Sequence, residues 1–459
     1  MTGNAHSNIS VRVGAGSGFW GDALDPAIEL AERGGLHYLC FDFLAELTMS
    51  LLQRARAKDP NQGYVPDMVS WLSKLTEPAH ASGTTLLCNG GGVNPRAGAE
   101  ALAGSLRAKG ITGRKIGIVS GDDVLHRLEE FRRAGIKLAH SETGEDGFDR
   151  IKSKIVSANV YLGSDGIIDA LEAGSDIIVT GRVTDSALFI APTMHRLGWN
   201  FDQHDRVASA ITIGHILECA AGCTGGMSSR FDEMPHMGEV GFPTAEISGD
   251  GTAIISKLPG SGGRVDEFTI KEHLVYEIGD PRQYFTPDGV ADFTAPTIEE
   301  IEPDVVRVTG MRGQARPKDL KLLIGYSDGW IGEGLLMFPW PRALARARKA
   351  EQTLRERFER LNLVSSSISF DFVGVNMLHG PAAPWPATDN LNEVGLRVAV
   401  KTASREEAEK VRRACSQMWI MGPGGTSFGA PMKPRPTLAL WPTLVPRELV
   451  PHSVEYVIS

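Results

Sequence analysis

The sequence predicts an α/β protein with a mostly parallel sheet and helices on both faces, followed by a smaller C-terminal α+β domain of ferredoxin type. Before residue 211, short apolar segments alternate about five times with glycine-containing turns and helical segments, which is typical of a parallel sheet. From residue 241 short β-like runs take over, and a charged amphipathic helix is expected at 343–361. We place the two domains at 9–340 and 345–459.

Composition and charge exclude several classes of protein. The 459 residues carry a net charge of -9, so the basic surface of a nucleic-acid-binding protein is not expected. The five cysteines are an odd, widely spaced set, which indicates a reducing compartment rather than a disulfide framework. The sequence shows neither a secretory leader pattern nor a membrane-spanning apolar run. We therefore expect a cytoplasmic protein with no nucleic-acid or membrane partner.

The first strand, at 9–13, leads through a glycine-rich turn into a helix at 26–33. Such a turn can hold an anion, because its free N–H groups and the dipole of the following helix point in the same direction. The third glycine of the dinucleotide fingerprint is missing, so a phosphate, carboxylate or thioester group is favoured over NAD. The candidate substrate-binding residues of this turn are Gly14, Gly16, Ser17 and Asp22.

The second unit is a buried strand at 36–42 followed by a helix that continues to about residue 57. Asp42 and Glu46 lie near the C-terminal end of the strand, where open α/β sheets usually bind ligands. Asp42 either caps the helix or acts chemically. We select Glu46 as a candidate substrate-binding residue.

The third unit is a strand at 83–89, a glycine-rich loop and a helix at 96–109. Asn89 and Asn94 flank three consecutive glycines and a valine, so backbone and amide groups can come close to a polar ligand. Both asparagines are candidate substrate-binding residues.

The fourth unit places Asp122 and Asp123 between a strand at 115–119 and a helix at 124–134. Paired carboxylates after a strand can bind a metal or serve as a base, and they can equally cap the helix. We select Asp122 as a candidate substrate-binding residue. We assign no metal, because the sequence contains no specific metal-ligand spacing.

A strand at 158–163 and a helix at 165–173 precede the strand at 176–180, which has the most polar C-terminal end of all. Arg182 can fork onto a carboxylate or phosphate, and Asp185 can fix that arginine or act on the substrate. The alternative is a purely structural Arg–Asp pair.

The centre of the site is expected at 211–226, where a short helix carries His215, Glu218 and Cys219 at spacings of three and four. Imidazole, carboxylate and thiol groups on one face suit acid–base or covalent catalysis. The alternative is a buried helix whose polar groups are merely hydrogen-bonded and whose cysteines pack as small hydrophobes. The helix is expected to stop in a turn with exposed N–H groups. Its candidate substrate-binding residues are Thr224, Gly225 and Gly226.

The remaining chain predicts a strand-rich region packed beside the sheet, and then the C-terminal domain. The strand-like runs are 244–248, 252–257, 265–278, 305–310 and 320–326. After the helix at 343–361, a strand at 395–401, a helix at 405–418 and a strand at 453–458 fit a ferredoxin-type domain. The glycine-rich loop at 421–429 is a second candidate anion nest or lid, with a flexible linker as the alternative.

Longer motifs combine into a recognisable set. They lie at 14–22, 43–46, 89–95, 120–123, 159–163, 181–185, 214–219, 224–226 and 284–288. Over residues 9–340 this set closely resembles the acyclic terpene utilisation family of AtuA-like proteins, and the tail from about 345 resembles the ferredoxin-fold extension of the family more weakly. The resemblance implies breakdown of branched acyclic terpene acids as CoA thioesters. Gly222 and Cys223 stand where the family usually has Gln and Val, so the substrate would differ if that Gln binds it, and Cys223 is not counted as a family site.

Three functional hypotheses follow. The first is a catabolic enzyme that hydrates, dehydrates or isomerises an organic acid or its acyl-CoA, with His215 or Glu218 as base and Arg182 or the 89–94 loop holding the carboxylate or oxyanion. The second is acyl or CoA transfer through Cys219, assisted by His215. The third is a non-catalytic binding subunit. We expect no cofactor other than coenzyme A within a thioester substrate, and a homo-oligomer, with a small partner subunit under the third hypothesis.

Overall fold

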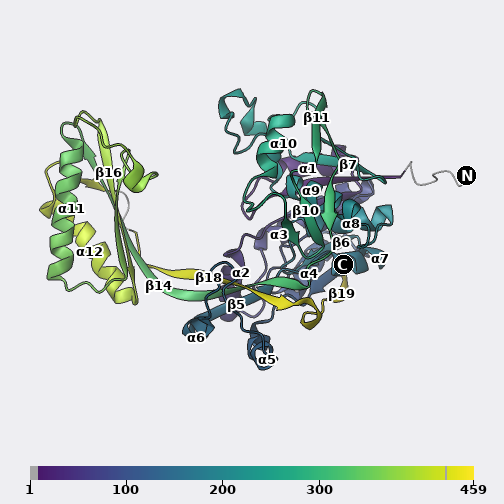
Figure 1. Ribbon diagram of the computed structural model, residues 1–459, viewed down its shortest axis with the longest axis horizontal. Helices are drawn as coiled ribbons and strands as arrows, with labels where there is room; N and C mark the ends of the chain where they lie inside the picture. The colour runs from purple at the N-terminus through teal and green to yellow at the C-terminus, as the bar shows by residue number, and fades with distance from the viewer. Residues whose placement is uncertain (1–8, 429–431) are drawn as a thin grey trace, which may run out of the picture. The chain divides into compact units, whose positions relative to one another are not determined.

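The computed structural model describes residues 9–428 and 432–459, and the described chain divides into two compact units (Figure 1). The first unit contains the residues up to 325 together with 440–459, and the second contains 326–439. The sequence-based division assigned everything after 345 to one domain. The structure instead returns 440–459 to the first unit, because the last strand of the chain pairs with the central sheet.

Parallel strands form the centre of a large mixed sheet in the first unit. They are β1 (Ser10–Ser17), β2 (Tyr38–Phe41), β3 (Thr85–Cys88), β4 (Lys115–Ser120) and β6 (Ile177–Thr180), in the order β1-β2-β3-β6-β4. The strands are short apolar runs, most of whose residues are buried, because helices cover both faces. The predicted α/β class is therefore confirmed.

Antiparallel strands extend this sheet at both edges. Beyond β1 the order continues through β7 (Pro243–Ser248), β8 (Ala253–Lys257), β12 (Val305–Thr309) and β11 (Thr297–Glu302). At the other edge β19 (Ser453–Ile458) pairs with β4. The strand-rich region thus lengthens the sheet instead of packing beside it, because β7 pairs directly with the edge of β1. The strand at 453–458, expected in the C-terminal domain, belongs to the main sheet.

Two sets of helices cover the sheet, and within each set neighbouring helices contact one another. One set is α1 (Asp25–Arg33), α3 (Pro66–Ala81) and α4 (Pro95–Ala108), and the other is α7 (Asp165–Glu172), α8 (Ala187–Leu197) and α9 (His204–Glu218). The return from β4 to β6 reverses the direction of strand addition, which places the two sets on opposite faces. The shorter α2 (Thr48–Lys58) follows β2.

One local prediction was wrong, and two are correct in type but differ in detail. The run at 265–278 contains a helix, α10 (Glu267–Leu274), because Asp266 and Thr269 form a reciprocal capping box that starts it. The strand predicted at 158–163 is β5 (Ile155–Val160), which pairs with β14 (Asp319–Pro339) and not with the parallel strands. The helix predicted at 124–134 begins as a 3₁₀ turn and continues as α5 (Leu128–Arg133), after which comes the one-turn α6 (Phe148–Ile151).

A small antiparallel sheet contacts α9 and completes the surroundings of that helix. Its strands are β9 (Tyr284–Thr286), β10 (Gly289–Asp292) and β13 (Arg312–Gln314). Tyr284 and Phe293 stack on each other with ring centroids 4.7 Å apart, and both rings lie 5.0 Å from that of His215.

The second unit contains an antiparallel sheet and two long helices among its described residues. Its elements are the later part of β14, α11 (Ala343–Arg360), β15 (Ser367–Val373), β16 (Glu393–Thr402), α12 (Arg405–Met421), β17 (Ser427–Phe428) and the first part of β18 (Arg435–Pro446). Phe338, Leu354 and Val398 belong to the apolar core between sheet and helices. The end of the candidate nest at 421–429 lies outside the described residues, so that site stays a prediction.

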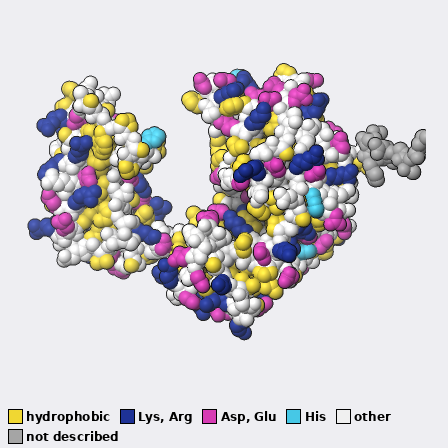
Figure 2. Space-filling view, viewed as in Figure 1, with side chains coloured by type: hydrophobic (Ala, Val, Ile, Leu, Met, Phe, Trp, Pro, Cys, Tyr) yellow, Lys and Arg dark blue, Asp and Glu magenta, His cyan; other side chains and the backbone are white. Residues whose placement is uncertain are grey.

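Every helix within the described chain is too short or too polar to cross a membrane. Acidic and basic side chains are interspersed over the visible face of each unit (Figure 2).

Candidate active site

The polar residues that follow the parallel strands gather at one edge of the central sheet, where open α/β sheets bind ligands. Ser17 ends β1, Asp42 and Asn89 directly follow β2 and β3, and Arg182 follows β6 after one glycine. Ser17 Oγ donates a hydrogen bond to the backbone carbonyl of Asp42 (2.8 Å), which links the end of β1 to the residue after β2.

Asp42 is a buried carboxylate held by hydrogen bonds. Asn89 Nδ2 and the Leu44 N–H donate to its Oδ1, at 2.5 and 3.0 Å. The oxygen of the Asn89 amide accepts from the Phe43 N–H (2.8 Å), so both ends of this amide bond to the protein. Burial and the nearby charge of Asp185 raise the pKa of Asp42 well above its ordinary value, although Arg182 and these hydrogen bonds act against the shift.

Arg182 is a fully buried cation. Its Nη1 donates to the Leu44 carbonyl (2.6 Å), its Nη2 lies 3.0 Å from Asp185 Oδ1, and its guanidinium carbon lies 4.0 Å from the centre of the Tyr161 ring. Burial alone would lower its pKa, but Asp185, Tyr161 and Asp42 raise it, so the charge persists. Arg182 Nε has no hydrogen-bond partner among the described residues. The predicted Arg182–Asp185 pair therefore forms, with one donor group left over.

His215 and Glu218 form a buried pair on the last turn of α9. The spacing of three residues places them on one face, and His215 Nδ1 lies 3.1 Å from Glu218 Oε1. Burial lowers the pKa of His215 to about 4, with the Leu274 backbone and Asp185 acting in the opposite direction. Burial and the charge of Asp185 raise the pKa of Glu218 well above its ordinary value.

The outer atoms of this pair, His215 Nε2 and Glu218 Oε2, are both buried and have no hydrogen-bond partner among the described residues. Such groups are rare in folded proteins and call for an explanation. The Asp185 side chain, which acts on the pKa of both residues, keeps 31% of its surface exposed. His215 and Glu218 are therefore buried, whereas the neighbouring Asp185 carboxylate is partly exposed to solvent.

Cys219 directly follows the last helical residue of α9. Helix α9 ends at Glu218, and Cys219 is its C-terminal cap, before a 3₁₀ turn at Ala220–Thr224. Burial raises the pKa of the Cys219 thiol, and the charges of Glu218, Asp42 and Asp185 raise it further. The thiol therefore lies close to these carboxylates. The expected common projection of His215 and Cys219 stays a prediction.

The carboxylates of Asp42, Asp185 and Glu218 surround Arg182 closely enough that charge on one raises the pKa of another. Burial therefore favours the protonated form of these carboxyl groups, while the pKa of His215, lowered to about 4, keeps its imidazole neutral at pH 7. Within the described chain, no group of three or more His, Cys, Asp or Glu side chains is arranged to hold a metal ion.

Comparison with known proteins identifies the family. The family model described as acyclic terpene utilisation family protein AtuA matches residues 11–456. The chain belongs to this family. The family match runs through both units. The searches among curated proteins and solved structures found no match.

In this AtuA-family chain the glycines of the first motif have a packing role. Gly14 and Gly16 lie within β1, where an added Cβ would approach Leu36 and Phe41 to 2.5 and 2.3 Å. Asp22 closes its own turn by accepting from the Gly18 N–H (2.8 Å). The turn itself reaches the cluster, because a Cβ on Gly18 would lie 2.6 Å from the backbone of Cys219.

The other candidate binding residues of the family motifs are engaged in internal contacts. Asp122 accepts from Asn159 Nδ2 (2.8 Å), and burial raises its pKa to about 7 although the Arg182 backbone also donates to it. Asn94 Nδ2 donates to two carbonyls of the 60–62 loop. Glu46 pairs with Lys321 (2.8 Å), whose ammonium lies over the Tyr161 ring. Asp122 thus fixes the backbone of Arg182, and Asn94 fixes a neighbouring loop.

The turn at Thr224 closes the 3₁₀ segment and holds a neighbouring loop. Thr224 Oγ1 donates to the Gly241 carbonyl (2.7 Å), and the Gly226 N–H donates to the Ala221 carbonyl (2.8 Å). Gly225 has a φ of +101°, which favours glycine, and an added Cβ would lie 2.5 Å from Met234. The amide of Gly226 is therefore used inside the turn.

Sequence reasoning missed the aromatic wall of the site. Tyr284 lies beside the His215–Glu218 pair, and burial and the charge of Glu218 both raise the pKa of this tyrosine. His273 stacks on His215 with ring centroids 5.8 Å apart. The ring of Tyr161 packs against the Arg182 guanidinium, and the Tyr161 hydroxyl has no hydrogen-bond partner within the described chain. Tyr161 and Tyr284 both lie in the family motifs, which was the available signal.

Proposed function

We propose that this protein is a catabolic enzyme of acyclic terpene or related acid breakdown, acting on an organic acid or its acyl-CoA thioester by hydration, dehydration or isomerisation. The observation that carries the proposal is the His215–Glu218 pair, whose outer atoms are buried beside Arg182 with no hydrogen-bond partner among the described residues. A neutral base and a protonated acid in one site suit proton transfer next to a carbonyl group. The family supports the pathway, and the site supports the reaction class.

In the forward elimination, His215 Nε2 takes the proton from the carbon next to the carbonyl, and the C–H electron pair becomes the new C=C bond. The hydroxyl on the next carbon leaves as water after it receives a proton from Glu218 or Asp185, whose raised pKa values favour the protonated form. Hydration is the reverse. Isomerisation returns the abstracted proton to a different carbon. Arg182 Nε is the donor that supports negative charge on the carbonyl oxygen.

This chemistry needs no redox cofactor, and coenzyme A enters as part of the substrate. The described cysteines are free, which supports the reducing cytoplasm as the compartment. We also propose the expected homo-oligomer. In the second unit, the order strand–helix–strand–strand–helix–strand supports a ferredoxin-type extension.

Deuterium exchange tests the proposed reaction. We expect the protein, incubated in D₂O with branched acyl-CoA thioesters and the matching free acids, to replace hydrogen next to the carbonyl by deuterium in one member of the panel. NMR and mass spectrometry detect this exchange even where the overall equilibrium hides turnover. Ligand-induced thermal stabilisation with no exchange and no product across the panel would contradict the enzyme assignment and leave the binding-subunit hypothesis.

A separate prediction concerns acyl transfer through Cys219. Burial and the neighbouring Glu218 and Asp42 raise the pKa of this thiol, so the nucleophilic thiolate is disfavoured. We expect Cys219 in the folded protein to react with iodoacetamide at pH 7 at least about tenfold more slowly than in the protein unfolded in urea. Peptide mass spectrometry gives both rates. Faster labelling in the folded protein would favour the covalent route.

A further inference from the structure

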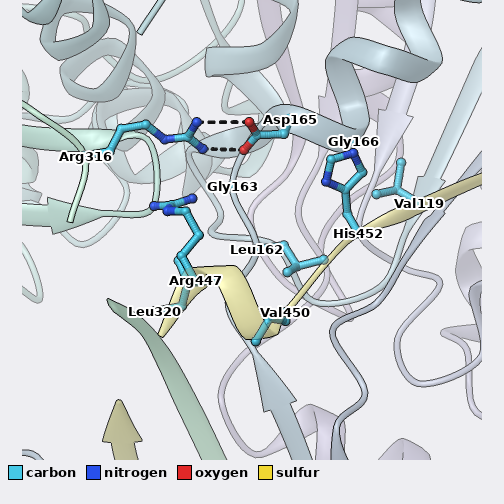
Figure 3. Close-up of a pocket in the computed structure, with 10 residues that line it drawn as sticks. All are labelled: Val119, Leu162, Gly163, Asp165, Gly166, Arg316, Leu320, Arg447, Val450 and His452. Atoms are coloured by element: carbon cyan, nitrogen blue, oxygen red, sulfur yellow. Dashed lines mark hydrogen bonds and ion pairs between the residues drawn. The ribbon is translucent and has the colours of Figure 1, made fainter. Parts of the chain in front are cut away.

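A pocket lies in the first unit, and its lining contains no residue of the Arg182–His215 cluster. Its apolar lining comes from Val119 of β4, Leu162, Leu320 and Val450, and its volume is about 140 Å³. Figure 3 shows Leu162 and Val450 on one side of the pocket and the guanidinium groups of two arginines on the other. The pocket therefore combines an apolar part with a cationic part.

The cations are Arg316 and Arg447, and only Arg316 forms an ion pair with a carboxylate among the described residues. Both Nη atoms of Arg316 donate to the carboxylate of Asp165 at the start of α7, and the bond from Nη1 measures 3.0 Å (Figure 3). Arg316 Nε donates to the Pro287 carbonyl (3.1 Å). Arg447 donates from Nη2 and Nε to the carbonyls of Pro287 and Pro317, which carry no charge. Among the described residues, no carboxylate is in ion-pair contact with Arg447.

The surrounding carboxylates do not remove this imbalance. Asp288 lies 3.9 Å from Arg316, but its Oδ1 accepts from the Ser164 N–H and hydroxyl, and burial raises its pKa. Asp169 is paired with His452 Nε2 at 2.8 Å. Burial and the charge of Arg316 lower the pKa of Arg447 although Asp165 and Asp288 act in the opposite direction, which indicates two cations close together whose repulsion is only partly offset. An anion in the pocket would relieve this repulsion.

The size of the pocket limits the ligand. An apolar cavity of about 150 Å³ in another protein holds one benzene molecule, so this pocket has room for about six or seven non-hydrogen atoms. Inorganic phosphate would leave the four apolar side chains without a partner. A carboxylate suits the planar guanidinium of Arg447, and a short aliphatic chain suits the apolar walls.

We propose that this pocket binds a short aliphatic monocarboxylate, with the carboxylate on Arg447 and the chain against Leu162, Leu320 and Val450. The ligand is a free acid of about five carbons, bound at a site separate from the catalytic pair. The proposal is independent of the reaction assigned to His215.

Calorimetric titration and saturation-transfer NMR with 3-methylbutanoate test this site. We expect saturable binding to the wild-type protein, and binding at least about tenfold weaker for the neutral 3-methylbutanamide and for inorganic phosphate. Arg447→Gln removes the cation, and Val450→Phe fills the apolar part while keeping the cation. Both variants should weaken acid binding at least about tenfold. Arg282→Gln, which removes an exposed arginine elsewhere, is the matched control and should bind as wild type.

Several outcomes would overturn the proposal. These are no saturable binding to the wild type up to about 10 mM, phosphate binding as tightly as the acid, or unchanged acid binding in both pocket variants. Acid binding that survives Val450→Phe but is lost in Arg182→Lys would place the acid at the catalytic cluster instead. If Arg447→Gln does not fold, as judged by thermal melting, Val450→Phe decides. Binding retained in His215→Asn separates this site from the proposed catalytic function.

Discussion

Replacing His215 with asparagine is expected to lower kcat/KM by a factor of about 10² to 10⁴, because the variant loses the proposed base. The asparagine amide can still contact Glu218, so the acid partner stays in place, whereas nothing occupies the position of Nε2. The measurement is the rate of deuterium exchange, and of turnover, with the acyl-CoA or acid that the exchange panel identifies. The wild-type kcat/KM should also fall as the pH decreases through about 4, where His215 becomes protonated.

His273→Asn is the matched control for this variant. His273 is buried and stacks on His215, and burial and the charge of His215 lower its pKa to about 4. Its ring forms a hydrogen bond with the backbone of His215, and it makes no hydrogen bond with Glu218 among those found in the described chain. The two variants remove the same group from the same aromatic stack, so their thermal stabilities should fall similarly. We expect His273→Asn to change kcat/KM by less than about tenfold. Equal activity in the two variants, with both folded, would remove His215 from the proposed mechanism.

Much of this site was predictable from the sequence because its residues follow strands or share a helical turn. Asn89 and Arg182 come after apolar runs, and the topology of parallel sheets brings such positions to one edge. His215 and Glu218 are three residues apart, which suffices to pair them on a helix. In each case a local pattern and a general rule of geometry determine the position. No long-range contact had to be known.

The parts that sequence reasoning missed depend on contacts between distant segments. Gly14 and Gly16 resemble an anion-binding turn, but their role follows from Leu36 and Phe41, which pack against them only in the folded sheet. Tyr284 reaches the pair through a small sheet that the strand-like pattern alone does not place. Helix α3 was not predicted, although Pro66 stands at its first position, where proline is favoured.

The structure also explains why the charges of the site were hard to judge from sequence. Asp42 could have been an ordinary helix cap, and Asp185 an ordinary partner of Arg182. Their pKa values depend on burial and on each other, and neither property is visible in a motif. Besides the substrate binding proposed for it, Arg182 therefore lowers the free-energy cost of burying these carboxylates.

Replacing Arg182 with methionine tests that role, and it should lower the free energy of unfolding by about 3–5 kcal/mol at pH 8, because it leaves Asp42 and Asp185 without their buried cation. The loss should depend on pH. Without the arginine, the folded-state pKa values of both carboxyls rise further, while the unfolded values stay near those of ordinary aspartates. The folded protein then binds more protons than the unfolded chain above about pH 4, so its stability falls as the pH increases. We expect the variant to recover much of the loss at pH 5.

Urea unfolding at pH 5 and pH 8 measures this dependence, and three further variants assign it. Arg182→Lys keeps the charge but loses the fork to Leu44 and Asp185, so it should be intermediate in stability, and it also serves if Arg182→Met does not fold. Adding Asp185→Asn to Arg182→Met should flatten the pH dependence, because it removes one of the titrating carboxyls. Arg282→Met, at an exposed ion pair, should behave as wild type at both pH values. An equal loss for Arg182→Met at pH 5 and pH 8 would show that the arginine stabilises the fold by packing on Tyr161 and not by its charge.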